Sequence, residues 1–373
     1  MNLWEEAEKI FFLGVEVYAF GLYCALGAAA ALIMLLLQCR REGLKQGTAA
    51  LTGMLSLALG FVCSRLLYCL LDQSLGLEGV MPLSGMLLVT GGGYSMVGAL
   101  LGGVLGALLA GKLSGQSSLY LADLMVPCLM LFAACERLGE GYVLDFGISR
   151  PLLGDLLKGS FLAVEGDYDW YLATYLLESF AALVLSVVLL RDAVQQHKDQ
   201  RAGKTLLLFL ILYGGVQTML ESLRYDRHMS ISFVGLQHVM AMAMLGLTVL
   251  YLALRMRKIN FRLSLAAIIS VPVTLGLGLA LEFAIDRNEI SRYLLYGVYA
   301  VVLALPLYLA KMHKMLIAVP AVLAAGLALR LLIGGPAIDR YVLYLAYAML
   351  LAVPMYLGVR LRKEDIPVGK TAD

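Results

Sequence analysis

Long apolar stretches recur along the chain from Ile10 to Val359, and charged or glycine- and proline-rich segments separate them. One helical membrane crossing needs about 20 mostly apolar residues. On that basis the pattern predicts eleven helices, starting near residues 11, 50, 93, 118, 170, 205, 236, 263, 293, 315 and 341. We therefore expect an all-α, polytopic integral membrane protein with about eleven transmembrane helices.

The composition supports a membrane protein. Of the 373 residues, 61% are apolar and 15% are charged, whereas soluble domains carry about 45–50% and about 25%. The net charge of +2 is too small to suggest a nucleic-acid partner. The six cysteines lie in or beside apolar runs, without the partners that a disulfide framework or a metal site requires. We therefore expect contact with membrane lipids, no metal and no cofactor.

The positions of the cations predict the orientation in the membrane. If loops are assigned alternately to the two sides, 18 of the 29 Lys and Arg residues fall on one side and 10 on the other, and Arg65 lies within a helix. Cations accumulate on the cytoplasmic side, so the N-terminus is expected outside and the C-terminus inside. The first nine residues carry three Glu and one Lys, the wrong sign for a signal peptide, so no cleavage is expected.

All unusual polar clusters lie before about residue 258. The sequence therefore predicts a seven-helix core over residues 1–258 and a four-helix membrane extension over residues 259–373. We find no convincing internal repeat, which disfavours a transporter built from inverted repeats.

Ionisable residues within a span need a partner or a function, because a charge at the bilayer centre costs about 2.5–3.5 kcal/mol. Arg65 is one such residue, and Tyr68 shares its helix face. Snorkelling, or pairing with a carboxylate such as Glu16, is an equally good explanation of Arg65. The glycine-rich segment from Gly91 to Gly103 allows close approach to another helix or to a lipid headgroup, of which helix packing is favoured. It lacks the Lys and Ser/Thr of a phosphate loop.

A further cluster ends the predicted fourth helix, where Glu136, Arg137 and Glu140 lie within five residues. An arginine can hold a lipid phosphate through two parallel hydrogen bonds. The same residues could equally form an ion-pair cluster that only closes the helix bundle, and the sequence does not separate these two roles.

The most polar cluster lies in the predicted sixth helix. Gln217, Glu221 and Arg224 are spaced four and three residues apart, so they share one face, which we expect to point into the bundle. His238 follows nearby. A single histidine is more often a hydrogen-bonded packing residue than a catalytic base.

The order of these features resembles the prolipoprotein diacylglyceryl transferase family over roughly residues 10 to 258. The matching segments are Phe20-Gly21-Leu22-Tyr23 with Gly27, Ser64-Arg65-Leu66-Leu67-Tyr68, Gly92 to Gly102 with Ser95, Ala122-Asp123 with Pro127, Arg137-Leu138-Gly139, Tyr175 with Glu178, and Leu212-Tyr213-Gly214 with Glu221, Arg224 and Gln237. Each motif alone is weak, and their shared order carries the resemblance. Four family residues are replaced: the histidine by Val97, a helix arginine by Gln217, an asparagine by Glu140 and a tyrosine by Phe20.

The resemblance implies a function in the bacterial plasma membrane. Family members transfer diacylglyceryl from phosphatidylglycerol to the lipobox cysteine of prolipoproteins, recognised through their signal peptides, and release glycerol phosphate. By resemblance, the catalytic set is Arg137, Arg224, Glu221 and His238, and the substrate-binding set is Arg65, Tyr68, Ser95, Glu140, Glu178, Gln217 and Gln237.

Roles within these sets follow from the chemistry. Cationic donors are needed on the phosphate, where negative charge develops as the glycerol phosphate leaves. Arg137 and Arg224 are expected to form this clamp, with Glu221 holding Arg224. No residue replaces the family histidine at its own position, and His238 and Glu140 are both candidates for the base.

Two other hypotheses stay open. The chain could be a catalytically altered or inactive relative that keeps a phospholipid pocket for lipid binding or partner docking, which the replacements at Val97 and Gln217 favour. It could also be an unrelated transporter or channel, which the missing repeat disfavours.

Overall fold

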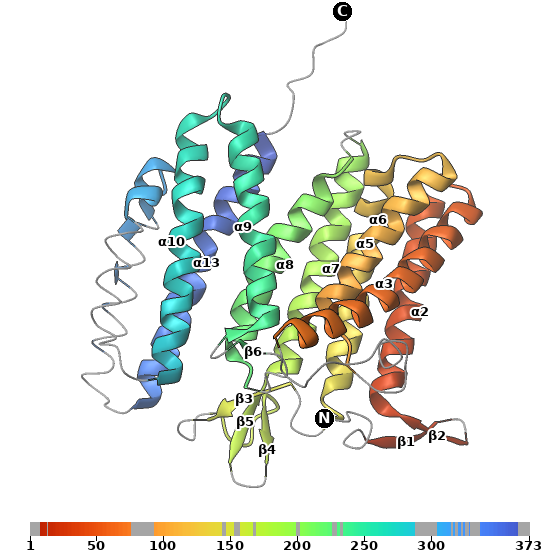
Figure 1. The fold of residues 1–373 in the computed structure, drawn as a ribbon, viewed down its shortest axis with the longest axis horizontal. Coiled ribbons are helices and arrows are strands. Elements are labelled where there is room, and N and C mark those ends of the chain that lie inside the picture. The colour runs from red at the N-terminus through yellow and green to blue at the C-terminus, as the bar shows by residue number, and fades with distance from the viewer. Residues whose placement is uncertain are drawn as a thin grey trace, which may run out of the picture. The chain divides into compact units, whose positions relative to one another are not determined.

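A computed structural model of the chain describes residues 8–12, 14–75, 93–143, 147–152, 157–166, 169–198, 202–225, 230–231, 234–287, 304–314, 316–317, 320–321, 324, 328 and 336–364 (Figure 1). The chain divides into two compact units. The first comprises Met1–Leu152, Gly159–Phe209 and Arg224–Met229, and the second comprises Leu153–Lys158, Leu210–Leu223 and Ser230–Asp373. The first part of the helix predicted near residue 293, most of the one predicted near 315, and Gly91 and Gly92 lie outside the described residues.

The first unit is a bundle of long apolar helices: α2 (Ala19–Arg41), α3 (Gln46–Leu75), α5 (Met96–Ser114), α6 (Ser118–Glu140) and α7 (Thr174–Lys198). Helix α6 packs against α2, α5 and α7, and α3 packs against α5. Most of α6 is buried, Asp123 and Arg137 included. The unit is therefore organised around α6, whose last turn carries one of the polar clusters.

Small residues allow α5 to approach α3 closely. A Cβ atom at Gly98 would lie 2.6 Å from the carbonyl oxygen of Cys63 and 2.8 Å from the Cα of Ser64. The Ser56 hydroxyl donates a hydrogen bond to the Gly103 carbonyl at 2.8 Å. Such contacts are typical of membrane helices that pack through small residues. They confirm the predicted packing role for the glycines of this segment that the structure describes.

The second unit contains α9 (Leu236–Met256), α10 (Phe261–Arg287) and α13 (Pro336–Glu364), which pack against one another. Helix α8 (Lys204–Leu223) begins in the first unit and ends in the second. Gly215 of α8 packs against the side chain of Met355 in α13, and a Cβ at Gly278 of α10 would lie 2.7 Å from the Tyr347 ring. The contacts around α13 thus join residues predicted for the core to residues predicted for the extension. The division at residue 258 remains a prediction, and the compact units group the residues differently.

The described residues also form three small antiparallel sheets, so the expectation of an all-α chain was incomplete. Strands β1 (Lys9–Phe12) and β2 (Val15–Tyr18) form a hairpin, β3 (Ile148–Pro151), β5 (Trp170–Ala173) and β4 (Ala163–Glu165) form a sheet in the order β3-β5-β4, and β6 (Ser230–Ile231) pairs with β7 (Val234–Gly235).

Two of the predicted helix starts fall on these strands. The helix predicted near residue 11 begins at Ala19, because Gly14, with φ of +84°, turns the chain between β1 and β2. Alternating residues in Val15–Tyr18 suit a strand better than a helix. Similarly, the helix predicted near residue 170 begins at Thr174, directly after β5.

Seven helices among the described residues are long and apolar enough to cross a membrane. They are Ala19–Arg41, Gln46–Leu70, Met96–Ser114, Ser118–Glu140, Lys204–Leu223, Leu236–Met256 and Phe261–Ala280. The protein is thus a mostly helical, polytopic membrane protein. The predicted total of about eleven spans and the outside position of the N-terminus remain predictions.

Candidate functional site

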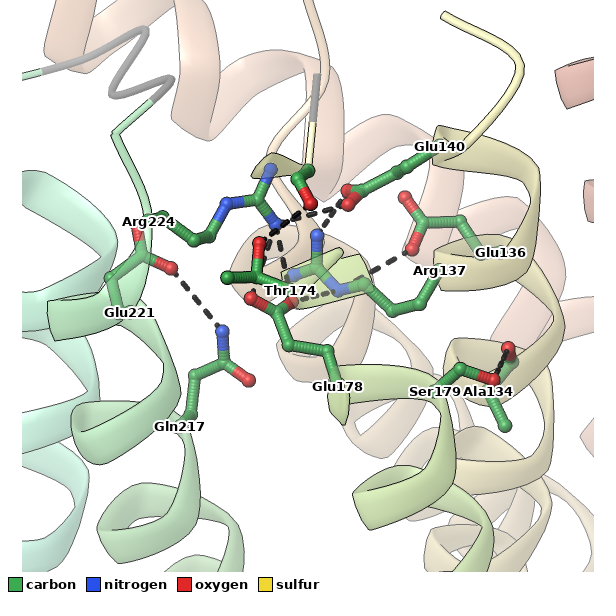
Figure 2. A network of polar contacts seen from close by, with 11 residues as sticks. Ala134, Glu136, Arg137, Glu140, Thr174, Glu178, Ser179, Gln217, Glu221 and Arg224 are labelled. Carbon is green, nitrogen blue, oxygen red and sulfur yellow. Dashed lines mark hydrogen bonds and ion pairs between the residues drawn. The ribbon is translucent and has the colours of Figure 1, made fainter. Parts of the chain in front are cut away.

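The main polar cluster of the first unit gathers side chains from three separate segments. The last turn of α6 supplies Glu136, Arg137 and Glu140, the first turns of α7 supply Glu178, and Arg224 follows the end of α8. Figure 2 shows the two arginines pointing toward the same carboxylates. We refer to these five residues as the arginine–glutamate cluster.

Arg137 makes three ion pairs in this cluster. Its Nε lies 2.7 Å from Oε2 of Glu178 and 3.7 Å from Oε2 of Glu136. Its Nη1 donates to Oε1 of Glu140. Its Nη2 is buried and has no hydrogen-bond partner among the described residues. One edge of the guanidinium therefore keeps a donor that a ligand could use.

Arg224 binds the same two glutamates. Its Nη1 lies 3.0 Å from Oε2 of Glu140 and 3.1 Å from Oε2 of Glu178. Glu140 and Glu178 thus each bridge Arg137 and Arg224, which holds the two guanidiniums close together. Two neighbouring guanidiniums can bind a phosphate through several charge-assisted hydrogen bonds.

Because these ion pairs are buried, loss of one partner destabilises the protein strongly. The side chains of Arg137, Arg224, Glu140 and Glu178 are each at most 5% exposed. Buried charges require partners, because desolvation costs several kcal/mol per ion. The described cluster has three carboxylates and two guanidiniums, so negative charge is in excess if all are ionised. An arrangement of this kind can accept a proton or lose a carboxylate contact when another anion binds.

Backbone contacts fix the position of Arg224. Residue Ser149 of β3 forms a β-bridge with Arg224, and the Tyr225 amide donates to the Ile148 carbonyl at 3.0 Å. The carbonyl of Gly147 accepts hydrogen bonds from the Thr174 hydroxyl at 2.6 Å and from the Tyr175 amide at 3.0 Å. The chain around β3 therefore ties Arg224 to the start of α7, from which Glu178 projects.

Asp123 lies near the start of α6, away from the arginine–glutamate cluster at its end. Its carboxylate accepts hydrogen bonds from the backbone amides of Gly203 at 2.6 Å and Leu206 at 2.7 Å. These amides lie at the N-terminus of α8, where donors lack partners within the helix and negative charge is favourable. Asp123, which is 3% exposed, thus caps the helix that leads to Arg224.

Arg65 forms a separate group in the first unit. Its Nη1 donates to the Gly93 carbonyl at 2.9 Å, and its guanidinium lies 6.0 Å from the centre of the Tyr68 ring and 5.8 Å from that of Tyr94. Burial raises the pKa of the Tyr94 phenol, and the nearby Arg65 opposes this shift. The Tyr68 ring packs on Gly93. The predicted shared face of Arg65 and Tyr68 is confirmed.

Ser95 makes hydrogen bonds at the start of α5. It precedes α5 and its hydroxyl accepts a hydrogen bond from the Gly98 amide at 3.3 Å. Its carbonyl accepts a hydrogen bond from the Ser64 hydroxyl at 2.8 Å. These contacts join the start of α5 to α3 beside Arg65.

The remaining predicted residues lie in the second unit. The side-chain amide of Gln217 donates to Glu221 at 3.3 Å, and both side chains are buried, which confirms that these two share one helix face. Arg224, predicted for the same face, lies after the end of α8 and pairs with Ser149 in a β-bridge. His238 is fully buried, and its Nε2 lies 2.7 Å from the hydroxyl of Tyr347 in α13. Gln237 is half-buried in the first turn of α9.

The contact between His238 and Tyr347 was not foreseen from the sequence. Tyr347 lies in a generally apolar segment with several tyrosines, and a tyrosine in such a segment signals no role by itself. The Nε2 atom of His238 could act as a base only by exchanging its contact with Tyr347 for a contact with substrate.

A hollow of about 460 Å³ opens between α2, α6 and α7. Its lining is mostly apolar and includes Gln38, Arg41 and Leu124. None of the predicted site residues lines this hollow. Leu124 lies in the first half of α6, whereas Arg137 lies in its last turn, so the hollow is distinct from the cluster.

Comparison with known proteins links the sequence of this chain to one family. A sequence model of the family described as prolipoprotein diacylglyceryl transferase matches residues 8–254. Three relatives, each named phosphatidylglycerol–prolipoprotein diacylglyceryl transferase, match about 60% of this chain. The relative from Bacillus velezensis is 25% identical over 243 residues, covering 63% of this chain and 87% of the relative. The one from Bacillus licheniformis is 25% identical over 238 residues (62% and 85%), and the one from Clostridium tetani is 23% identical over 224 residues (59% and 86%).

Proposed function

Because the chain belongs to the prolipoprotein diacylglyceryl transferase family, we propose that it transfers diacylglyceryl from phosphatidylglycerol to the cysteine thiol of a prolipoprotein. The products are a thioether-linked lipoprotein precursor and glycerol phosphate. We place this reaction in the bacterial plasma membrane, where the acceptor is presented by its signal peptide, with the N-terminus of the enzyme on the outer side.

The observation that carries this proposal is the convergence of Arg137 and Arg224 on Glu140 and Glu178 in a buried cluster. A phosphatidylglycerol phosphate bound there would meet two guanidiniums. As the carbon–oxygen bond breaks, negative charge grows on the departing phosphate, and preorganised cations stabilise that charge most strongly in a buried setting. The two arginines therefore favour the transition state.

Other residues are assigned supporting roles. We propose that Glu178 positions both arginines, in keeping with its contacts to each of them. Glu221 is proposed to hold Arg224, and Gln217 and Gln237 to line the path of the substrate. Arg65, with Tyr68 and Ser95 beside it, is proposed to bind the polar part of the lipid or of the signal peptide.

A second candidate function follows from one specific position. Val97, which matches the family histidine by resemblance, is 1% exposed and apolar, so it cannot accept a proton. A relative without a base could keep the arginines as a phosphatidylglycerol-binding module and have lost the transfer reaction.

The two functions are separated by expressing the chain in bacterial cells depleted of their own diacylglyceryl transferase. Lipidation of a lipobox substrate is followed by the increase in the mass of that substrate. Bound phosphatidylglycerol is followed by native mass spectrometry of the purified protein. We expect lipidation by the wild-type chain, its loss in Arg137→Ala, and its retention in Arg257→Ala, which removes an exposed arginine at the end of α9. Lipid binding without lipidation would instead support the binding module.

A further inference from the structure

We propose that Glu140 is the general base of the reaction and that the substrate phosphate itself releases it for this task, by taking the place of Glu140 on Arg137. This inference rests on the proposed transferase function. Val97, which matches the family histidine by resemblance, is apolar and cannot accept a proton. The proposal gives this role to Glu140.

The three nitrogens of Arg137 differ in their partners. Nε is paired with Glu178, Nη1 is paired with Glu140, and Nη2 is buried with no hydrogen-bond partner among the described residues. A phosphate that binds an arginine through two parallel bonds can use the edge formed by the two terminal nitrogens. At Arg137 that edge holds one vacant donor and one donor occupied by Glu140. The incoming phosphate would therefore compete with Glu140 and leave the Nε contact of Glu178 intact.

Arg224 would take part in the same exchange. Its Nη1 contacts Oε2 of Glu140 at 3.0 Å and both carboxylate oxygens of Glu178 at 3.1 and 3.3 Å. If the phosphate bridges the two arginines, Glu140 loses its contacts to both, whereas Glu178 retains Arg137. Glu140 is thus the carboxylate that the phosphate frees.

The surrounding charges favour proton uptake by the freed carboxylate. Among the described residues, Glu140 faces Glu136 and Arg137 of α6, Glu178 of α7 and Arg224 after α8. The Cys24 thiol of α2 interacts electrostatically with Glu136 and Glu140. A phosphodiester brings a further negative charge to a cluster that already has more carboxylates than guanidiniums. A buried carboxylate that has lost its cations and sits beside like charges favours the protonated form.

The thiol of the acceptor can supply that proton. A cysteine with a pKa of about 8.5 is mostly protonated at neutral pH, and only its thiolate is a good nucleophile. Glu140 takes the thiol proton, the sulfur forms a bond to the glycerol carbon of the lipid, and the bond from that carbon to the phosphate oxygen breaks. The leaving oxygen keeps the electron pair, and Glu140 returns the proton to the phosphate group of the departing glycerol phosphate. Charge and atoms balance without a cofactor.

The test compares purified wild-type protein with Glu140→Gln, with phosphatidylglycerol in detergent micelles and an acceptor peptide that carries one lipobox cysteine. Glutamine keeps the size of the side chain but cannot take the proton. We expect the lipidation rate at pH 7 to fall about 100-fold or more, with phosphatidylglycerol binding retained. Glu165→Gln, which changes an exposed glutamate of β4, is the matched control and should keep the wild-type rate.

The pH profile separates a base from a structural residue. Raising the pH from 7 to 9.5 increases the thiolate fraction of a free cysteine on the order of 30-fold, so the Glu140→Gln rate should rise toward that of the wild type. An equal deficit at both pH values, or a wild-type rate at pH 7, overturns the proposal and leaves the transferase function standing. The same holds if His238→Gln, rather than Glu140→Gln, shows the pH-dependent recovery. A wild-type protein without transfer activity refutes the proposed function itself.

Discussion

Replacing Arg224 by alanine tests whether charge balance stabilises the arginine–glutamate cluster. In the wild type, Nη1 of Arg224 contacts Glu140 at 3.0 Å and Glu178 at 3.1 Å, with every one of these side chains at most 5% exposed. Without Arg224, only Arg137 of the described cluster faces the three carboxylates. Breaking a buried ion pair by removing one partner costs about 3–5 kcal/mol, and we expect Arg224→Ala to lose stability of that order.

A second substitution should restore part of this loss. In the double variant Arg224→Ala, Glu178→Gln, one surplus negative charge is gone while the shape of the side chain at 178 is kept. Residues in one ion-pair network couple by about 0.5–3 kcal/mol, so the double variant should be more stable than Arg224→Ala alone. Lipidation activity should not return, because the phosphate clamp still lacks one arginine.

The measurement is unfolding of each purified variant in a mild detergent, followed by loss of helical circular dichroism, next to the lipidation assay. Arg257→Ala, which removes an exposed arginine directly after α9, is the control and should unfold like the wild type. The reasoning is refuted if Arg224→Ala is as stable as the wild type, or if the double variant is no more stable than the single one.

Three further changes probe the surroundings of the site, each by thermal unfolding. Asp123→Ala removes two charge-assisted hydrogen bonds to the start of α8, so a loss of roughly 3 kcal/mol is expected, and wild-type stability would contradict the capping role. Gly98→Val forces side-chain atoms against the α3 backbone and should cost about 1–3 kcal/mol, whereas Gly47→Ala, which meets open space, should be neutral. Tyr347→Phe removes the hydroxyl that meets His238 and should cost about 1–3 kcal/mol; an unchanged melting curve would show that this contact adds little.

The local pattern of apolar and polar residues was sufficient to predict where most of the described helices begin. The starts predicted near residues 118 and 236 coincide with α6 and α9, and those near 50, 93, 205 and 263 lie within four residues of the observed starts. Apolar run length and glycine spacing are properties of neighbouring residues, so they can be read directly from the chain. The hairpin at Lys9–Tyr18 was missed because its apolar residues also fit the beginning of a helix.

The members of the candidate site were identified one by one, and an ion-pair cluster of Glu136, Arg137 and Glu140 was one of the alternatives, but the pairing between separate segments was not predicted. Arg137, Glu140, Glu178 and Arg224 were each selected from the sequence or by resemblance. The sequence assigned Glu221 to hold Arg224 but did not indicate that Glu140 and Glu178 bridge both arginines. Those contacts span 84 and 46 residues, and no local spacing rule links positions so far apart.

The sequence by itself determined that this is a polytopic helical membrane protein with ionisable residues at a few unusual positions, because hydropathy and charge act residue by residue. Only the tertiary structure decided which charges meet. Packing of α6 against α7, and the tie between β3 and Arg224, bring distant guanidiniums and carboxylates together. Packing of α13 on α9 likewise buries His238 against Tyr347, 109 residues away. Such contacts depend on the relative placement of whole elements, since a buried charge or imidazole is stable only where another segment supplies its partner.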